Sequence, residues 1–476
     1  MSTTKRAVVV GSGPNGLAAA ITLASAGIQV VVYERASRFG GGTRSSELTI
    51  DGLIHDECSG FHPLAVATEF AQLARLEDFG LVWRWPKVQY SSPLLHGVGA
   101  AAYRTVADTA AGLGADATAW RSVFGSLEDS FADVSRDFLQ PVLRVPNHPL
   151  RLAQFGLRAG LPAAMLARRF RTEEGRALFG GVAAHAIRPF SSPLSSAIGV
   201  ALGTAAHSFG WPVAAGGSQA IANAMVQALL ALGGRVETNR HVDSVAELGD
   251  PDIVMLDVAP QAAVALVGDA LPGRVRNGLA RYQHGPGAFK VDFAVEQGVP
   301  WGHAASHLAG TVHVGGTYAE TAQAEVDVHK GRMPAKPFVL VGQQYLADPQ
   351  RSSGDVHPVY AYAHVPADYQ GDATVAIEEQ IERFAPGFRE RIVVRHVQST
   401  TDLAKRNPNY VGGDIVTGAN SPRQLVFRPR VTTSPYSLGV PGMYLCSAAT
   451  PPGAGAHGMC GFNAARVALR EHGIIG

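Results

Sequence analysis

The segment Ala7–Glu34 has the sequence AVVVGSGPNGLAAAITLASAGIQVVVYE and decides the fold. Its first apolar run, Ala7–Val10, is typical of a buried parallel strand. The Ala-rich segment Leu17–Ala26 predicts a helix, which Gly27 can end because glycine tolerates the left-handed conformation of a helix C-terminus. A second apolar run, Gln29–Tyr33, predicts another strand. The segment therefore predicts a strand–helix–strand unit.

The turn between the first strand and the helix carries the pattern G-x-G-x-x-G, as Gly11-Ser12-Gly13-Pro14-Asn15-Gly16. In a dinucleotide-binding unit the first glycine permits the tight turn, the second lets the backbone approach a pyrophosphate, and the third allows close helix–strand packing. The helix start offers free N–H groups to the phosphates. Glu34 follows near the spacing of about 20 residues at which a carboxylate binds a ribose hydroxyl. The pattern predicts a dinucleotide site, and it does not distinguish NAD from FAD.

The whole chain has 476 residues, of which 46% are apolar and 17% are charged, and its formal net charge is +1. A chain of this length predicts two intertwined domains. The low charged fraction indicates a large interior or an apolar pocket. A net charge so close to zero gives no support to nucleic-acid binding.

The sequence also bears on the cellular compartment. The segment before Ala7 has no apolar signal sequence, and no uninterrupted apolar stretch reaches the roughly 18 residues of a membrane span. The three scattered cysteines, Cys58, Cys446 and Cys460, form neither a disulfide framework nor a C-x-x-C dithiol. We expect a cytoplasmic protein, and we predict no metal site.

A second glycine run follows the predicted ribose-binding acid, because Glu34-Arg35 is followed by Gly40-Gly41-Gly42-Thr43. The backbone of such a run can lie against a cofactor. This segment resembles the E-R-x-x-x-x-G-G segment of FAD enzymes in the phytoene desaturase and amine oxidase superfamily. The resemblance implies that the loop passes along the ribityl chain and pyrophosphate of FAD.

Another strong signal lies near the C-terminus, where the apolar run Met443–Cys446 leads through a glycine-rich loop to a helix predicted from Gly458. This part resembles the flavin-binding motif of phytoene-desaturase-like proteins, in particular the branch of pyridine nucleotide-disulfide oxidoreductase domain-containing protein 2. The resemblance implies that Ser447, Gly458 and Met459 contact the flavin, with the helix start directed at its N1–C2=O edge. It also implies non-covalent FAD, since no cysteine stands where covalent attachment is usual.

The same resemblance assigns roles to three further positions. Ser59 and His62 would face the isoalloxazine ring, and the backbone of Val242 would lie against the adenine. Ser447 and Ala449 stand where glycines are common, and the acid that often binds the ribityl chain is missing from the loop. The group that binds the ribityl chain therefore stays open.

The resemblance implies an α/β fold, in which a Rossmann-type FAD-binding domain carries an inserted substrate domain of antiparallel sheet plus helices, as in glutathione reductase-2 and amine oxidase-like proteins. We assign residues 1–70, 211–275 and 431–476 to the FAD-binding domain, and residues 71–210 and 276–430 to the substrate-binding domain. Between about residues 71 and 188 strand signals fade, so we expect that part to be mostly helical.

Three residues are candidates for catalysis. The segment Gly285–Trp301 predicts a long strand with Lys290 and Asp292 on the same face. Lys290 resembles the lysine that amine and polyamine oxidases hold near flavin N5 through a water, and the alternative is a solvent-facing lysine paired with Asp292. His62 and His185 are candidates to take a proton, because an imidazole with its ordinary pKa near 6.5 titrates close to neutrality. The alternative for His185 is a buried structural histidine.

The segment Leu143–Arg171 is amphipathic and basic. Such a helix can lie on a membrane surface, which would make the protein peripheral to a membrane. The commoner role of such a helix is a solvated face over a core, and both interpretations stay open. The oligomeric state also stays open.

The favoured function is a single-FAD oxidoreductase that desaturates a hydrophobic small molecule, such as a polyene or isoprenoid, by hydride transfer to flavin N5. No second strand–helix–strand unit with its own glycine pattern is evident, which argues against an NADPH domain. The alternatives are a reduced-flavin isomerase or saturase, an amine oxidase, and a catalytically silent flavin-binding interaction protein. The sequence does not reveal the aromatic pair that amine oxidation favours.

Overall fold

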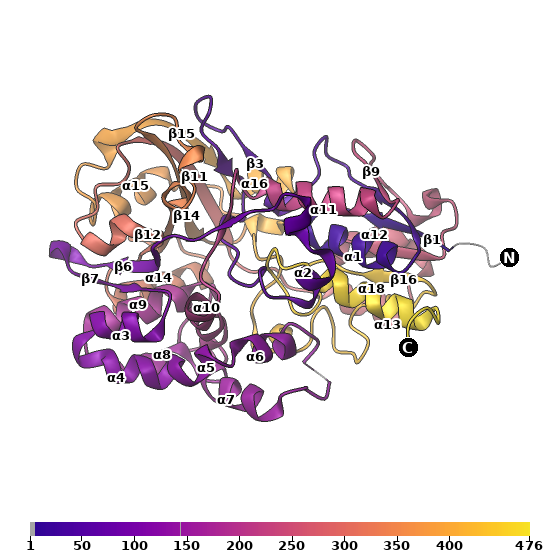
Figure 1. Ribbon diagram of the computed structural model, residues 1–476, viewed down its shortest axis with the longest axis horizontal. Helices are drawn as coiled ribbons and strands as arrows, with labels where there is room; N and C mark the ends of the chain where they lie inside the picture. The colour runs from indigo at the N-terminus through magenta and orange to yellow at the C-terminus, as the bar shows by residue number, and fades with distance from the viewer. Residues whose placement is uncertain (1–4, 143) are drawn as a thin grey trace.

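The computed structural model describes residues 5–142 and 144–476. A five-stranded sheet and a seven-stranded sheet form the frame, at the right and the upper left of Figure 1. The smaller sheet is parallel throughout. Its strands follow the order β16 (Met443–Leu445), β10 (Ile253–Leu256), β1 (Arg6–Val10), β2 (Gln29–Tyr33) and β9 (Arg235–Glu237). All five lie within the three segments that the sequence assigns to the dinucleotide-binding domain.

Helices cover both faces of the parallel sheet. Alternation along β1 directs Ala7 and Val9 to one face and Val8 and Val10 to the other. The first face packs against α1 (Pro14–Ser25), α11 (Gln219–Ala231) and α18 (Met459–Glu471). The second face packs against α12 (Pro260–Val267) and α13 (Gly273–Ala280). Burial on both faces explains why β1 is an unbroken apolar run.

The strands of the larger sheet lie in the segments that the sequence assigns to the substrate-binding domain. Its strands follow the order β15 (Ile392–Gln398), β11 (Gly287–Glu296), β14 (Val356–Val365), β13 (Val339–Gly342), β12 (Ala309–Val314), β6 (Val88–Pro93) and β7 (Gly99–Ala102). Each neighbouring pair is antiparallel except β12 and β6, which run parallel. The predicted strand around Lys290 is confirmed as β11, which pairs antiparallel with β14 and β15.

The expectation of a helical region between about residues 71 and 188 is wrong over β6 and β7. These strands contain Ser91, Ser92 and three consecutive alanines, which are poor intrinsic strand formers. Pairing with β12 places β6 in the sheet, and β7 follows as the edge strand. Tertiary contacts therefore override the local preference.

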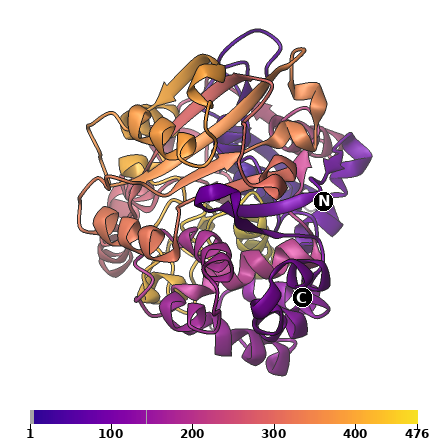
Figure 2. The same cartoon turned by 90° about the vertical axis from the view of Figure 1, so that its left-hand side faces the viewer.

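Helices cover the face of the larger sheet that contains Tyr360 and Tyr362 of β14, and they fill the lower half of Figure 2. They are α3 (Val106–Gly112), α4 (Ala117–Trp120), α5 (Ser126–Glu128), α6 (Phe131–Phe138), α7 (Pro149–Ala159), α8 (Ala163–Ala167), α9 (Glu173–Ala184) and α10 (Ser196–Ser208). The predicted start of the basic segment, Leu143, lies outside the described residues. The opposite face of this sheet packs against α15 (Thr374–Glu382).

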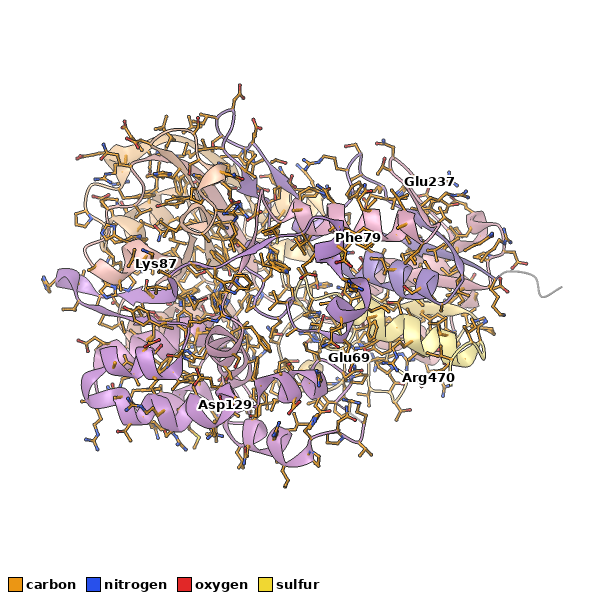
Figure 3. The ribbon with its side chains drawn as sticks, in the orientation of Figure 1. Glu69, Phe79, Lys87, Asp129, Glu237 and Arg470 are labelled. Atoms are coloured by element: carbon orange, nitrogen blue, oxygen red, sulfur yellow. The ribbon has the colours of Figure 1, made fainter. Side chains whose placement is uncertain are left out.

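The remaining α-helices and strands lie outside these groups. They are α2 (Glu69–Ala74), α14 (Tyr318–His329), α16 (Thr400–Arg406), α17 (Pro422–Val426) and the two-stranded ribbons β3 (Ser45–Ser46) with β4 (His55–Asp56) and β5 (Trp83–Arg84) with β8 (Val213–Ala214). Figure 3 places Glu237 at the outer edge of the parallel sheet and Asp129 among the helices of the other domain. Within residues 5–142 and 144–476, no helix has the length and apolar character needed to cross a bilayer.

Candidate functional site

One cavity of about 970 Å³ extends from the parallel sheet into the second domain. Its volume lies at the upper end of the range for small-molecule sites, about 300–1,000 Å³. At one end its wall is the glycine turn after β1, the 41–44 loop, residues 240–243 and 257–259, and the 447–449 loop. At the other end its wall is mostly apolar and comes from α6, α7, α10 and β14. A dinucleotide and an apolar ligand could therefore meet in one space.

The three glycines of the turn all pack against one residue, Asp257, at the carboxyl end of β10. A Cβ placed on Gly11 would lie 2.8 Å from the carbonyl oxygen of Asp257, and one placed on Gly13 or Gly16 would lie 2.7 or 3.0 Å from its Oδ2. The Gly16 N–H donates to that Oδ2 at 3.0 Å. The absent side chains thus make room for a buried carboxyl group as well as for a ligand. Burial raises the pKa of Asp257 to about 7, and the nearby Glu34 charge also raises it.

Asp257 was not predicted from the sequence. The signal that could have identified it is its position at the carboxyl end of a strand next to β1, since ligands of parallel sheets bind at that edge. Asn409 lies beside it, because its side-chain amide donates to the Asp257 carbonyl oxygen at 3.2 Å.

Glu34 lies at the end of β2, as expected for a ribose-binding acid. Its Oε2 accepts hydrogen bonds from the Ser12 backbone N–H at 3.0 Å and the Ser12 hydroxyl at 2.6 Å. Its Oε1 accepts one from the Ala36 N–H at 2.8 Å. These bonds fix the carboxylate beside the glycine turn and on the wall of the cavity.

Most predicted site residues line the cavity. They are Gly11, Ser12, Gly13, Pro14, Asn15, Glu34, Arg35, Gly41, Gly42, Thr43, Ser59, His62, His185, Val242 and Ser447. Segments distant in the sequence therefore converge, and their individual roles stay predictions.

Five predicted site residues do not line the cavity: Gly16, Gly40, Lys290, Gly458 and Met459. Gly16 packs on Asp257, and Gly40 faces Gln219 and Ala222 on α11. A Cβ on Gly458 would lie 2.6 Å from the Phe70 ring and 2.9 Å from Ala18 Cβ, so this glycine serves helix packing. The Met459 N–H donates to His457 Nδ1 at 3.1 Å. The first N–H of α18 is therefore already bonded within the protein.

Lys290 is buried on β11, and its ammonium group is paired with Asp292. The ammonium lies 4.7 Å from the centroid of the Tyr360 ring, which does line the cavity. Asp292 also faces His55 at 3.6 Å and accepts a hydrogen bond from the Gln398 amide at 3.3 Å. The pairing matches the alternative interpretation of Lys290, whereas its burial does not. Its role through a water stays a prediction.

His62 has one nitrogen bonded and one without a hydrogen-bond partner among the described residues. Its Nε2 lies 3.0 Å from the Ser218 hydroxyl, which donates to the Ser59 carbonyl oxygen at 2.6 Å. The hydroxyl must then accept from Nε2–H, which leaves a lone pair on the buried Nδ1. Burial lowers the pKa of His62 to about 4, so the imidazole is neutral at pH 7.

His185 follows α9 and lies at the apolar end of the cavity. Its Nε2 is 2.9 Å from His313 Nε2 on β12, so one of the two rings donates to the other. Burial lowers the pKa of His185 to about 3 and lowers that of His313 well below its ordinary value. The neutral His185 ring therefore lies on a mostly apolar wall, with its Nε2 already bonded to the neutral His313 ring.

Aromatic residues that sequence reasoning missed also line this end. Tyr360 and Tyr362 alternate along β14 onto the same face, with ring centroids 5.8 Å apart and planes at 88°. Trp211 packs edge-on against His185 at 5.6 Å. No local pattern marks these residues, because the sheet and α10 bring them together from distant segments.

The glycine-turn end of the cavity fits FAD on two observations. Asn15 Oδ1 and Ser447 Oγ are buried, line the cavity and have no hydrogen-bond partner among the described residues. Gly41 approaches the Gly13 backbone so closely that a Cβ on Gly41 would lie 2.9 Å from Gly13 Cα. A narrow backbone cradle with unpaired polar atoms suits a diphosphate and a polyhydroxyl chain. Ser447 thereby becomes a candidate for binding the ribityl chain.

Comparison with protein families agrees with the parallel sheet. Residues 9–75 match the model of the NAD(P)-binding Rossmann-like domain. Pyridine nucleotide-disulfide oxidoreductase domain-containing protein 2 of Mus musculus is 26% identical over 248 residues, which cover 48% of this chain and 41% of the mouse protein. The Rattus norvegicus protein is 26% identical over 267 residues, which cover 52% and 44%. The matched region spans less than half the length of these relatives.

Solved structures establish the overall fold. An oxidoreductase from Methanosarcina mazei has a TM-score of 0.62 at 14% identity and covers 97% of this chain and 99% of its own. Putrescine oxidase bound to putrescine has a TM-score of 0.58 at 18% identity, with 98% of each chain covered. Cyclohexylamine oxidase from Brevibacterium oxydans has a TM-score of 0.56 at 15% identity and covers 99% and 98%. The predicted α/β fold with a Rossmann-type domain is confirmed.

Proposed function

We propose that this protein is a FAD-dependent oxidoreductase that removes two hydrogens from adjacent carbons of an apolar substrate and leaves a C=C bond. The observation that carries the proposal is the single cavity that joins a dinucleotide-type glycine turn to an apolar wall. FAD, when bound, supplies the acceptor for a hydride from a substrate C–H bond. The protein then has to bind both ligands, exclude water and take up one proton.

The dinucleotide would be bound by the cavity's polar end. The glycine turn at residues 11–15 would receive the diphosphate, Glu34 the ribose hydroxyls, and Val242 the adenine. Asn15 and Ser447 offer polar atoms that the protein leaves unpaired. The roles of Asn15 and Ser447 rest on these unpaired atoms, and the role of Val242 rests on the family resemblance.

The substrate should carry no positive charge. The acidic residues that line the cavity are Glu34, Asp243 and Asp257, and all three lie at its dinucleotide end. Among the described lining residues, the far end has no carboxylate that could pair with an ammonium group. A cation there would be desolvated without compensation. This charge pattern favours a hydrocarbon-like substrate, such as a polyene or isoprenoid.

His62 is the better candidate to accept the proton. Its Nδ1 lone pair is unpaired, whereas His185 shares its Nε2 with His313. Its pKa near 4 makes it a weak base at neutral pH. We expect proton transfer to it only in concert with loss of the hydride, since a free carbanion would need a stronger base.

The test is an anaerobic titration of the FAD-loaded protein, followed by the flavin absorbance. NADH and NADPH should leave the band unchanged, and a reduced polyene or isoprenoid should bleach it. Bleaching by either nicotinamide at stoichiometric amounts would contradict the proposed direction and indicate a saturase or a reduced-flavin isomerase.

Amine oxidation is the second candidate, because Tyr360 and Tyr362 supply an aromatic pair beside the cavity. The ammonium group of Lys290 lies against the face of the Tyr360 ring. Putrescine and cyclohexylamine are the matched probes in the same titration. Rapid bleaching by either amine, with none by the apolar compounds, would replace the first proposal with this one.

A further inference from the structure

Three cationic side chains are buried in the part of the protein that the structure describes: Lys290, Arg351 and Arg428, with exposed fractions of 3%, 1% and 4%. Lys290 is paired with Asp292. Arg351 is paired with Asp56 at 2.6 Å and with Asp348 at 3.2 Å. These two follow the rule that buried charges are compensated by an opposite charge.

Arg428 departs from that rule. Its Nη2 donates to Asn420 Oδ1 at 2.7 Å, and its Nε donates to the Gln424 carbonyl oxygen at 3.1 Å. Longer bonds of 3.4 Å lead from Nη2 to the Gly418 carbonyl oxygen and from Nη1 to the Ala448 carbonyl oxygen. All of these acceptors are neutral. Within the described chain, no carboxylate lies within the 4.0 Å that defines an ion pair with Arg428.

The guanidinium also lies at the cavity. Arg428, Asn420 and Ala448 all belong to its wall. A Cβ on Gly453 would lie 2.7 Å from Arg428 Nη1, so a side chain at position 453 would clash with the guanidinium. Its Nη1 makes one long bond within the protein, which leaves donor capacity for a ligand.

A buried, uncompensated guanidinium on a cavity wall is costly unless a ligand brings the opposite charge. Neutral carbonyl groups accept most of its hydrogen bonds and hold its plane, but they leave its charge uncompensated. Planar guanidinium groups suit pairs of oxygen atoms in particular. The ligand group that fits is therefore an anionic oxygen or a pair of them.

We propose that Arg428 is an anion-binding residue of this cavity and provides the counter-charge for an anionic oxygen of its ligand. Two sources have this chemistry: the pyrimidine ring of the flavin, which becomes negative when it gains electrons, and a carboxylate on an apolar substrate. The flavin source rests on the proposed function, whereas the carboxylate source does not.

The variants are Arg428→Gln, which removes the charge, and Arg428→Lys, which keeps it. Arg406→Gln is the matched control, because Arg406 also lines the cavity but is paired with Glu57 at 2.9 Å. Melting temperature identifies any variant that fails to fold. If the glutamine variant does not fold, the lysine variant is compared with the parent, since it keeps the charge but loses the planar donors.

Sulfite tests the flavin source in the FAD-loaded protein without substrate, since it adds to oxidised flavin and leaves negative charge on the pyrimidine ring. Decanoate and decanol test the carboxylate source through the fluorescence of Trp211, which lines the cavity and requires no flavin. If the flavin is the partner, Arg428→Gln weakens sulfite binding about tenfold to a hundredfold. If a substrate carboxylate is the partner, it weakens decanoate binding to that extent and leaves decanol binding unchanged.

Equal sulfite and decanoate affinities in the parent and Arg428→Gln, with both folded, overturn the proposal. So does an equal loss in Arg406→Gln, because the effect would then be general to cavity charge. Neither readout requires turnover. A protein that oxidises no apolar compound would refute the proposed reaction and leave the Arg428 result standing.

Discussion

At the scale of single residues, the cavity wall buries charges of both signs. Asp257 is a buried acid behind the glycine turn, and Arg428 is a buried cation beside the 447–449 loop. The diphosphate of a dinucleotide would bring negative charge next to Asp257. Protonated Asp257 should therefore be the form that tolerates the cofactor.

The first prediction is that FAD affinity falls as pH rises through about 7. The folded-state pKa of Asp257 is about 7, above its ordinary value of 3.8, so the neutral form dominates below pH 7 and the charged form above it. The groups around it, Glu34, Cys446 and Cys460, give no positive charge that would offset this. Asp257→Asn should flatten the pH profile of the FAD dissociation constant, measured by flavin fluorescence.

Proton uptake on FAD binding can also be detected by calorimetry. Near pH 7 the measured binding enthalpy should change with the ionisation enthalpy of the buffer in the parent protein but not in Asp257→Asn. An affinity that is constant between pH 6 and pH 8 would contradict the prediction. Asp243→Asn, at an exposed site on the same wall, is the control.

Residues whose roles depend on local backbone patterns could be predicted, and those placed by tertiary structure could not. The glycine turn and Glu34 belong to one short segment with its own pattern. Asp257, Tyr360 and Arg428 reach the cavity only because β10, β14 and the segment after α17 converge there. Gly458 and Met459 are the opposite case: a motif predicts ligand contacts for them, and the structure gives Gly458 a role in helix packing and the Met459 N–H a bond to His457.

At the scale of elements, β1 was predictable because burial on both of its faces makes it an apolar run, whereas the edge strand β9 has the sequence Arg-Val-Glu and is not one. Strands β6 and β7 were not predictable, because neighbours rather than their own residues keep them extended. Helix α7 is a third case. Its sequence shows an amphipathic segment but not which face is covered.

Helix α7 has apolar residues on two sides. Leu152, Phe155 and Ala159 line the cavity, whereas Leu150 and Leu157 are 80% and 76% exposed. Residues 140–172 contain six arginines and no acidic residue. An exposed apolar pair within a basic segment is complementary to an anionic lipid surface.

The second prediction is that α7 attaches the protein to anionic bilayers. The protein should sediment with vesicles of phosphatidylcholine plus phosphatidylglycerol, and less with phosphatidylcholine alone. Leu150→Ser with Leu157→Ser should lower the partition coefficient on the order of tenfold for each leucine. Replacing Arg168, Arg169 and Arg171 by Gln should lower it about fivefold for each charge.

The control for α7 is Leu230→Ser with Leu232→Ser, a pair that is 46% and 44% exposed at the end of α11. These changes should leave sedimentation unchanged. If the parent protein stays in the supernatant with both kinds of vesicle, α7 is a solvated face, as the commoner interpretation of its sequence has it.

At the scale of the whole molecule, burial sets the response to acid. Burial lowers the pKa values of several histidines, to about 4 for His62, His207 and His457 and to about 3 for His185. Unfolded histidine has a pKa near 6.5. Between about pH 6.5 and 4 the unfolded chain therefore binds more protons than the folded protein, and stability falls as pH falls.

The third prediction is a melting temperature that decreases steadily from pH 6.5 to about 4. The raised pKa of Asp257 stabilises the folded protein as pH falls over this range, but this is one group, and the four histidines act in the opposite direction. His207→Gln should make the decrease smaller, because the substitution removes one titrating group. His207 lies away from the cavity wall. His96→Asn, at an exposed position, should not change it. A constant melting temperature over this range would contradict the prediction.

The order of strands in the parallel sheet has a consequence for biosynthesis. Strand β10 has β1 on one side and β16 on the other, and α18 packs against α1. A ribosome would release β16 and α18 only after more than 400 further residues have followed β1. The sheet around the glycine turn can be completed only after β16 and α18 have been synthesised. Folding of this domain is therefore slow and of high contact order. We expect cofactor loading to follow the synthesis of β16 and α18, with chaperones protecting the unpaired edge of β10 until then.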